Sequence, residues 1–215
     1  MQVTTSYSQT DNNKALGKPA FNREFFFRWL LKPAVFILLL LPVVFLAWGV
    51  AQDTLGANPV ETVIRDLGEW GLRLLLLTLL VSPLRRLFNM PRLLRFRRML
   101  GLFAFFYVSL HVLAYVWLDQ GLDWQEIWLD IVDRPFITVG MLAFVLLIPL
   151  ALTSTKGMIR RLGKNWKRLH RLVYPIAILA IVHFFWMVKL DITEPVIYAF
   201  LLFFLLAERL YRKYL

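Results

Sequence analysis

The sequence of 215 residues contains no cysteine. This absence excludes disulfide bonds, iron–sulfur clusters held by cysteine, and covalent attachment of heme through a Cys-x-x-Cys-His motif. A metal ion or a metal-containing cofactor would therefore be bound by histidine or by oxygen ligands. Histidine is itself scarce, so each position can be considered on its own: His111, His170 and His183.

Charged residues are also few. They make up 18% of the chain, whereas a soluble domain usually has about 25%. Hydrophobic residues make up 59% and occur in blocks of nearly twenty residues, the length that crosses a bilayer core of about 30 Å. The net charge of +11 does not indicate nucleic-acid binding, because the positive residues lie at the ends of the apolar blocks, where membrane topology explains them.

The apolar blocks predict an all-α membrane protein, a bundle of six transmembrane helices. Helices are expected because an isolated strand leaves its backbone groups without partners in lipid. The predicted domain organisation is an N-terminal cytoplasmic tail over residues 1–32, a transmembrane domain over 33–207 and a short cytoplasmic tail over 208–215. The six predicted spans are Pro33–Val50, Leu67–Leu87, Met99–Leu118, Pro135–Leu152, Leu169–Val188 and Ile192–Ala207.

The distribution of lysine and arginine predicts the orientation. Of the 25 such residues, 21 lie in four segments that the six spans place on one side of the membrane: 1–32, 85–98, 156–171 and 209–213. The positive-inside rule puts this side, and with it both termini, in the cytoplasm. The remaining four are Arg65, Arg73, Arg134 and Lys189.

The opposite side carries an acidic segment over residues 119–133, in which five carboxylates are interleaved with Trp124 and Trp128. One interpretation is an amphipathic segment on the outer leaflet, because tryptophan is enriched at membrane interfaces. The other is a docking surface for a partner outside the membrane. The pattern favours the first interpretation.

Two histidines lie inside predicted spans, where ionisable residues are costly and usually functional. His111 lies about twelve residues into the third span and His183 about fourteen residues into the fifth, both counted from the cytoplasmic side. Two imidazoles at one depth on different helices suit the two axial ligands of a heme iron. Small residues on the same helix faces would leave room for the macrocycle: Ala104, Ala114 and Ala180. The alternative is a pair of histidines that form hydrogen bonds between helices.

Two further ionisable residues are candidates. His170 lies at the cytoplasmic end of the fifth span, thirteen residues and about 20 Å before His183, and about 140° from it around an ideal helix. Pro175 between them could bend the helix, so geometry alone does not decide whether His170 serves a second heme. Arg73, in the outer half of the second span, could pair with a heme propionate or with Glu69 one turn earlier.

Several motifs resemble a known family. The stretch 98–111 and the pair His170 and His183 resemble the ferric-reductase-like transmembrane heme domain. The motifs Gly56–Glu61, Leu152–Thr155 and Trp166–Tyr174 are similar to a narrower family, the heme-binding membrane subunits of a periplasmic protein-methionine-sulfoxide reductase. The resemblance covers nearly everything from Pro33 to Lys189.

The resemblance implies the cofactors and their ligands. It implies a b-type heme on His111 and His183, and His170 as the ligand of a possible second heme on the cytoplasmic side. Larger relatives have a second histidine fourteen residues before the outer ligand, where this chain has Arg97. This difference leaves open whether His170 has another partner, holds a five-coordinate heme, or serves a flavin or quinone site. The family is also associated with FMN.

The resemblance also implies a function. The chain would be an electron-transfer subunit of the bacterial inner membrane, taking electrons from the quinol pool or a flavin reductase and passing them to a periplasmic molybdopterin reductase. The sequence contains no Gly-x-Gly-x-x-Gly motif for a nicotinamide cofactor, so its electrons are expected from outside the chain. The alternatives are a stand-alone transmembrane ferric or oxygen reductase, and a non-redox transporter or scaffold.

Overall fold

The computed structural model describes residues 23–188 and 191–214, and these residues contain helices and no strand. The chain forms two compact units, residues 1–37 and 38–215. In the first unit, α1 (Arg23–Phe26) and a π-helical turn (Phe27–Leu31) precede the start of α2 (Lys32–Ala51). Most of the predicted N-terminal tail, residues 1–22, lies outside the described residues.

The all-helical prediction is confirmed. Five helical segments of the described chain are long and apolar enough to cross a membrane: Trp29–Ala51, Pro59–Leu87, Pro91–Asp119, Pro135–Leu152 and Lys164–Met187. All but the first residue of the sixth predicted span, Ile192–Ala207, lies in α10 (Thr193–Tyr214), which is not one of these five. Charged residues near both ends of α10, among them Glu194, Glu208 and Arg209, leave it a shorter apolar stretch.

Proline and capping residues fix where several helices begin. Asn58 caps α3 (Pro59–Leu87), because its Oδ1 accepts the Glu61 backbone N–H at 3.2 Å, and Pro59 occupies the first turn, where its missing N–H costs nothing. The helix α6 (Pro135–Leu152) likewise begins with proline. The connection from α3 to α4 (Leu94–Ala114) passes through Asn89, which adopts the left-handed backbone conformation, and a 3₁₀ turn at Pro91–Leu93.

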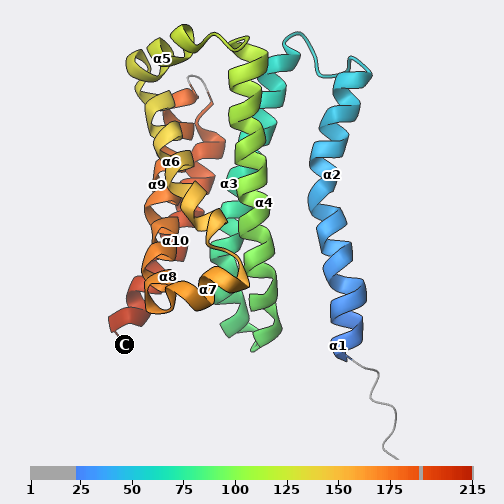
Figure 1. Cartoon of the computed structure of the whole chain (residues 1–215), viewed down its shortest axis with the longest axis vertical. Coiled ribbons are helices and arrows are strands. Elements are labelled where there is room, and N and C mark those ends of the chain that lie inside the picture. The colour runs from blue at the N-terminus through green and yellow to red at the C-terminus, as the bar shows by residue number, and fades with distance from the viewer. Residues whose placement is uncertain (1–22, 189–190, 215) are drawn as a thin grey trace, which may run out of the picture. The chain divides into compact units, whose positions relative to one another are not determined.

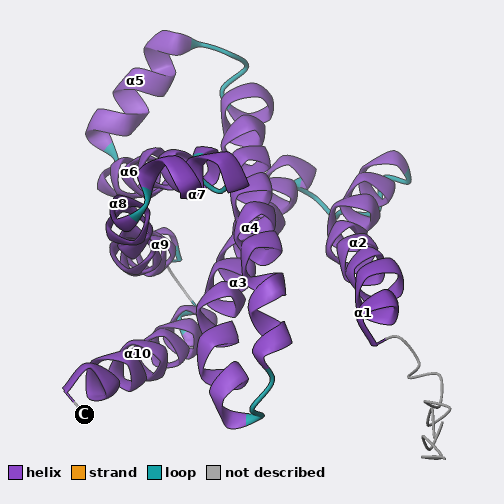
Figure 2. Cartoon of the chain, turned by 60° about the horizontal axis from the view of Figure 1, so that its bottom comes forward, coloured by secondary structure: helices purple, strands orange, loops and turns teal. Residues whose placement is uncertain are grey.

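Two antiparallel helix pairs form the core of the second unit. The helix α3 packs along α4, and α6 packs along α9 (Val173–Met187), as Figures 1 and 2 show. The helix α10 contacts both α3 and α9. The side chains of Leu74, Leu79, Tyr107, Ile176 and Ala177 are almost fully buried between these helices.

The part of α2 that belongs to the second unit is joined to α4 by Tyr107. The Tyr107 hydroxyl donates a hydrogen bond to the Leu39 carbonyl at 2.7 Å and accepts one from the Val43 backbone N–H at 3.2 Å. These two groups flank Pro42, which lies inside α2 and lacks a backbone N–H. A buried side chain of α4 therefore satisfies the backbone of α2 next to its proline.

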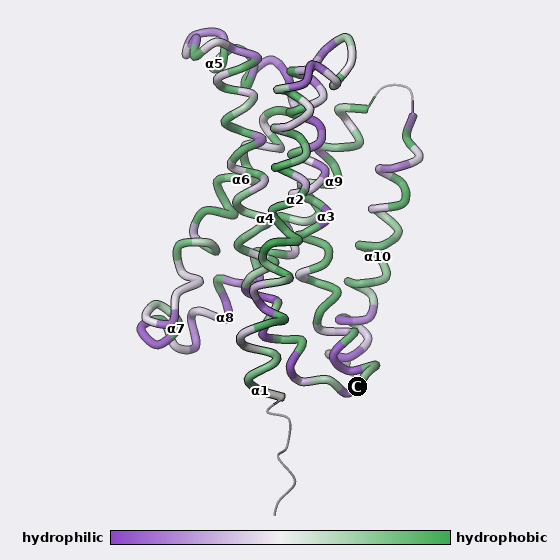
Figure 3. Tube along the Cα trace, turned by 90° about the vertical axis from the view of Figure 1, so that its right-hand side faces the viewer, coloured by the Kyte–Doolittle hydropathy of each residue, from purple (hydrophilic) through white to green (hydrophobic). Residues whose placement is uncertain are grey.

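Polar residues gather at the two ends of the bundle (Figure 3). We call one the α5 end, because it carries α5 (Trp124–Asp133), and the other the α7 end, because it carries α7 (Lys156–Leu162) and α8 (Lys164–Leu169). The helix α5 is amphipathic, as the sequence predicted: Ile127 is buried, while Trp124 and Trp128 are 68% and 66% exposed.

Candidate two-histidine metal centre

A cavity of about 380 Å³ lies between α3, α4, α6 and α9, towards the α5 end. Leucine, isoleucine, valine and phenylalanine side chains make up much of its lining, together with small residues on all four helices. The polar residues that line the cavity include two histidines and a group at its α5 end: Asn58, Glu61, Arg65, Glu69, Tyr115, Asp119 and Arg134.

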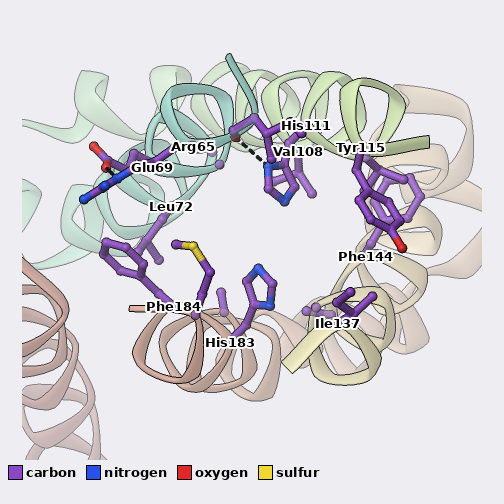
Figure 4. A pocket seen from close by; sticks show the side chains of 18 of the residues that line it. Arg65, Glu69, Leu72, Val108, His111, Tyr115, Ile137, Phe144, His183 and Phe184 are labelled. Atoms are coloured by element: carbon purple, nitrogen blue, oxygen red, sulfur yellow. Dashed lines mark hydrogen bonds and ion pairs between the residues drawn. The ribbon is translucent and has the colours of Figure 1, made fainter. Parts of the chain in front are cut away.

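His111 on α4 and His183 on α9 face each other across this cavity (Figure 4). Their ring centroids are 6.2 Å apart and the ring planes are inclined at 80°. The structure therefore brings together the two histidines that the sequence placed at equal depth. Each imidazole also forms a hydrogen bond to a neighbouring helix, as the alternative from the sequence had it, but it does so through Nδ1 and to a backbone carbonyl.

The Nδ1 atoms are held by backbone carbonyls. His111 Nδ1 lies 2.8 Å from the Ile64 carbonyl oxygen on α3, and His183 Nδ1 lies 2.7 Å from the Phe136 carbonyl oxygen on α6. A carbonyl oxygen only accepts hydrogen bonds, so both Nδ1 atoms carry the proton and both Nε2 atoms keep a lone pair. A hydrogen bond from the other ring nitrogen to a carbonyl is the usual way in which a metal-binding histidine is held in orientation.

A glycine allows each imidazole to approach its neighbouring helix. A Cβ atom added to Gly68 would lie 3.0 Å from His111 Nδ1, and one added to Gly140 would lie 2.8 Å from His183 Nδ1. Each glycine follows the hydrogen-bonding carbonyl by four residues, so it faces the imidazole one turn further along the helix. The two histidines are thus held in the same way, one by α3 and the other by α6.

The spacing of the imidazoles suits a metal ion between them. A metal–imidazole bond is about 2 Å long and the nitrogen lies about 1.2 Å from the ring centroid, so two imidazoles that bind one metal from opposite sides would place their centroids about 6.4 Å apart. The observed 6.2 Å agrees with this value. Two of the three alanines that were predicted to leave room for a flat macrocycle line the cavity. Ala104, Ala180, Gly68 and Gly140 line the cavity, whereas Ala114 is buried outside its lining.

Arg73 contacts residues beside the cavity rather than lining it. Its Nη2 lies 2.6 Å from Glu69 Oε2, its Nε donates to the Tyr198 hydroxyl at 2.8 Å, and its guanidinium lies 5.1 Å from the Trp70 ring centroid. Glu69, one of the two partners that the sequence suggested, is in contact with Arg73. Glu69 itself lines the cavity, so Arg73 is connected to the cavity by its ion pair with Glu69.

His170 lies at the α7 end, away from this cavity. It begins a 3₁₀ turn (His170–Leu172) that precedes α9, so it is not on one continuous α-helix with His183. Its ring stacks on Trp166 at 3.9 Å, and its Nδ1 lies 3.1 Å from the Trp166 carbonyl oxygen. Its Nε2 lies 3.5 Å from Ser154 Oγ. Arg97 is near enough to interact with His170 electrostatically.

Among the residues of the site that were not predicted from the sequence as part of it are two glycines and two arginines, Gly68, Gly140, Arg65 and Arg134. Gly68 and Gly140 carry no signal that distinguishes them from other glycines in apolar helices, because their role depends on which helix each one faces. Arg65 and Arg134 are, in the sequence, two of the four basic residues that lie outside the predicted cytoplasmic segments. The sequence shows that both arginines lie at the ends of apolar blocks. It does not show that both line one cavity, because that depends on how the helices pack.

Long apolar helices that enclose two opposed imidazoles define a multi-pass membrane protein with a candidate bis-histidine centre. Comparison with known proteins identifies the family. Residues 67–181 match the model of the ferric reductase like transmembrane component, and curated protein-methionine-sulfoxide reductase heme-binding subunits, named MsrQ, match most of the chain. The chain belongs to this family.

Three relatives show the extent of the similarity. The MsrQ subunit of Xanthomonas campestris pv. campestris is 51% identical over 188 residues, covering 85% of this chain and 86% of the relative. The subunit of Rhodospirillum rubrum is 56% identical over 178 residues, covering 82% and 86%. That of Caulobacter vibrioides is 56% identical over 158 residues, covering 73% and 75%. No solved structure matches the chain.

Proposed function

We propose that the chain binds b-type heme through His111 and His183 and serves as the electron-transfer subunit of a methionine-sulfoxide reductase system. The observation that carries this proposal is the pair of opposed imidazoles, 6.2 Å apart, each with Nδ1 engaged by a carbonyl. The lack of cysteine requires non-covalent binding. Heme held there supplies one-electron transfer, and the protein tunes it through axial ligands and burial.

The names of the relatives support the wider role. Each of the three is a heme-binding subunit of a protein-methionine-sulfoxide reductase. In our proposal, electrons from the quinol pool or from a reduced flavin such as reduced FMN pass through the site that His111 and His183 form to a periplasmic molybdopterin subunit. Sulfoxide reduction takes place on that partner. The chain's own residues hold the heme near the face where the partner docks.

The proposed topology has six spans in the bacterial inner membrane, with both termini in the cytoplasm. Contacts of α10 support its inclusion as the sixth span. Near the α5 end Tyr198 binds Arg73 at 2.8 Å, and near the α7 end Glu208 forms an ion pair with Arg86 of α3. This topology makes the α5 end periplasmic, in agreement with the positive-inside rule. A C-terminal green fluorescent protein fusion is expected to fluoresce, and a periplasmic alkaline phosphatase fusion there to be inactive.

His170 is proposed to serve a second centre on the cytoplasmic side, either a second heme or a flavin or quinone site. Its position at the α7 end and the nearby charge of Arg97 support a site for an anionic or redox-active group. A pyridine hemochrome count near two hemes per chain is the result expected for a second heme. A count near one, with FMN or quinone retained on purification, is the result expected for the other forms.

Anaerobic reoxidation kinetics test the proposed electron transfer. The purified full-length chain is reduced with dithionite, freed of excess reductant and mixed with the periplasmic reductase. We expect rapid reoxidation of the heme only when the reductase and methionine sulfoxide are both present. No reoxidation in that mixture, from a chain that contains heme, would contradict the proposed partner.

A stand-alone reductase is the second candidate, and the match to the ferric reductase like component favours it. The same experiment separates the two. Equally fast reoxidation by a ferric chelate or by oxygen, without the periplasmic subunit, would favour the stand-alone reductase. Reoxidation that requires the partner would favour the methionine-sulfoxide reductase system.

A further inference from the structure

The cavity contains a distinct cationic pair at its α5 end. Among the described residues that line it, two carry a permanent positive charge, Arg65 on α3 and Arg134 at the start of α6. Their side chains are 48% and 56% exposed, so each reaches from the cavity towards the membrane surface. Three carboxylates, Glu61, Glu69 and Asp119, also line this end.

Each arginine lies beside the carbonyl that fixes one imidazole. Arg65 directly follows Ile64, whose carbonyl binds His111, and Arg134 lies two residues before Phe136, whose carbonyl binds His183. The two helices that position the imidazoles therefore also position the two guanidinium groups. A group held between the imidazoles would meet one arginine from α3 and one from α6.

Both arginines retain capacity for another acceptor. Arg65 contacts Glu69 at 3.4 Å and Arg134 contacts Asp130 at 3.2 Å, and in both cases the arginine atom is Nε. Within the described part of the chain, their terminal nitrogens have no hydrogen-bond partner. Those nitrogens are donors that bind a carboxylate with a bidentate geometry.

A b-type heme carries two carboxylate groups on one edge. Placing them in the apolar part of the membrane is costly, so this edge is stable only where water or cations are available. The negative charges of Glu61, Glu69 and Asp119 would also repel the heme carboxylates unless cations lay between them. Among the described lining residues, the α5 end provides two such cations, Arg65 and Arg134, one for each carboxylate.

We infer that Arg65 and Arg134 bind the two heme carboxylates and direct that edge towards the α5 end. The inference rests on the proposed heme site at His111 and His183. It assigns to these two residues the role that the sequence suggested for Arg73, whose guanidinium is instead bound by Glu69 and Tyr198.

Hemin and hemin dimethyl ester, in which both carboxylates are uncharged, test the inference. The full-length chain is produced under heme limitation, purified in detergent and titrated with either compound, using the low-spin absorption band as the signal. We expect Arg65→Gln and Arg134→Gln each to weaken hemin binding about tenfold, the effect of losing one charge-assisted hydrogen bond. Neither variant should change the affinity for the ester.

Two control variants complete the design. Arg98→Gln removes an exposed arginine of α4 that does not line the cavity, and we expect it to bind both compounds as the unsubstituted chain does. Arg65→Lys retains the charge without the bidentate geometry, and we expect an intermediate loss of hemin affinity. A variant that simply fails to fold would lose affinity for the ester as well as for hemin.

The outcomes separate the inference from the proposed function. If the unsubstituted chain gives no low-spin band with either compound, the heme site itself is wrong. If it binds hemin normally and Arg65→Gln and Arg134→Gln match Arg98→Gln, the carboxylates bind elsewhere and the inference is overturned. Weaker hemin binding in Arg73→Gln alone would assign the carboxylates to Arg73 instead.

Discussion

Substitution of Gly140 by alanine should weaken the two-histidine centre. The added Cβ would lie 2.8 Å from His183 Nδ1 and 2.9 Å from Cε1. Ordinary contact begins at 3.4 Å, so the methyl group would come about 0.6 Å too close to the ring. The His183 ring cannot easily move away from the added methyl group, because its Nδ1 is hydrogen-bonded to the Phe136 carbonyl on α6, the helix that also carries Gly140. Either the ring or α6 must move.

The expected magnitude follows from this overlap. Overpacking a well-packed site typically costs about 1–3 kcal/mol, which corresponds to a loss of heme affinity of about 5- to 150-fold. Gly68→Ala should have a smaller effect, because its Cβ would lie 3.0 Å from His111 Nδ1. The assay is heme per chain after purification, together with the low-spin electron paramagnetic resonance signal, which reports the orientation of the axial imidazoles.

Gly101→Ala is the matched control. Gly101 lies within α4, and its added Cβ would meet only Thr78, at 3.7 Å or more. Alanine in the middle of a helix is favoured over glycine by about 1 kcal/mol, so this variant should keep its heme and be slightly more stable. If Gly140→Ala retains heme and an unchanged resonance signal, as Gly101→Ala does, His183 is not held by α6 in the way described.

Three further predictions concern residues outside the cavity. Tyr107→Phe removes the hydroxyl that binds the Leu39 carbonyl, and we expect it to destabilise the protein by about 1–3 kcal/mol, measured by thermal unfolding in detergent, without loss of the low-spin heme signal. Arg209→Gln removes the hydrogen bond to the Leu79 carbonyl at 2.8 Å, and a lower unfolding temperature is expected, whereas an unchanged one would show that α10 is held otherwise. His170→Ala should retain the heme bound at the α5 end, and loss of all heme from this variant would contradict the separation of the two sites.

The sequence was sufficient to predict the helical architecture and to select the two histidines. Apolar blocks of membrane-spanning length determine helices, because the backbone has no other way to satisfy its polar groups in lipid. Counting residues from the cytoplasmic side placed His111 and His183 at the same depth, and the structure has them face to face. Their assignment as heme ligands stays a prediction.

What could not be predicted depends on pairing between helices. Nothing in the sequence indicates that Gly68 faces His111, or that Gly140 faces His183, because such contacts require knowing that α3 packs on α4 and α6 on α9. The same holds for Arg73. A propionate and Glu69 were both possible partners from spacing alone, and only the packing of α10, which brings Tyr198 to the Arg73 guanidinium, shows how that side chain is bound.

The central claim is that His111 and His183 are the two axial ligands of one heme. The most direct test is a reduced-minus-oxidised absorption spectrum with a pyridine hemochrome count, recorded for the unsubstituted chain and for His111→Ala and His183→Ala made with ample heme. We predict a sharp low-spin b-type α band, and the loss of the same one heme per chain in each variant. A flat spectrum from the unsubstituted chain, or variants that retain its full heme content and α band, would contradict the claim.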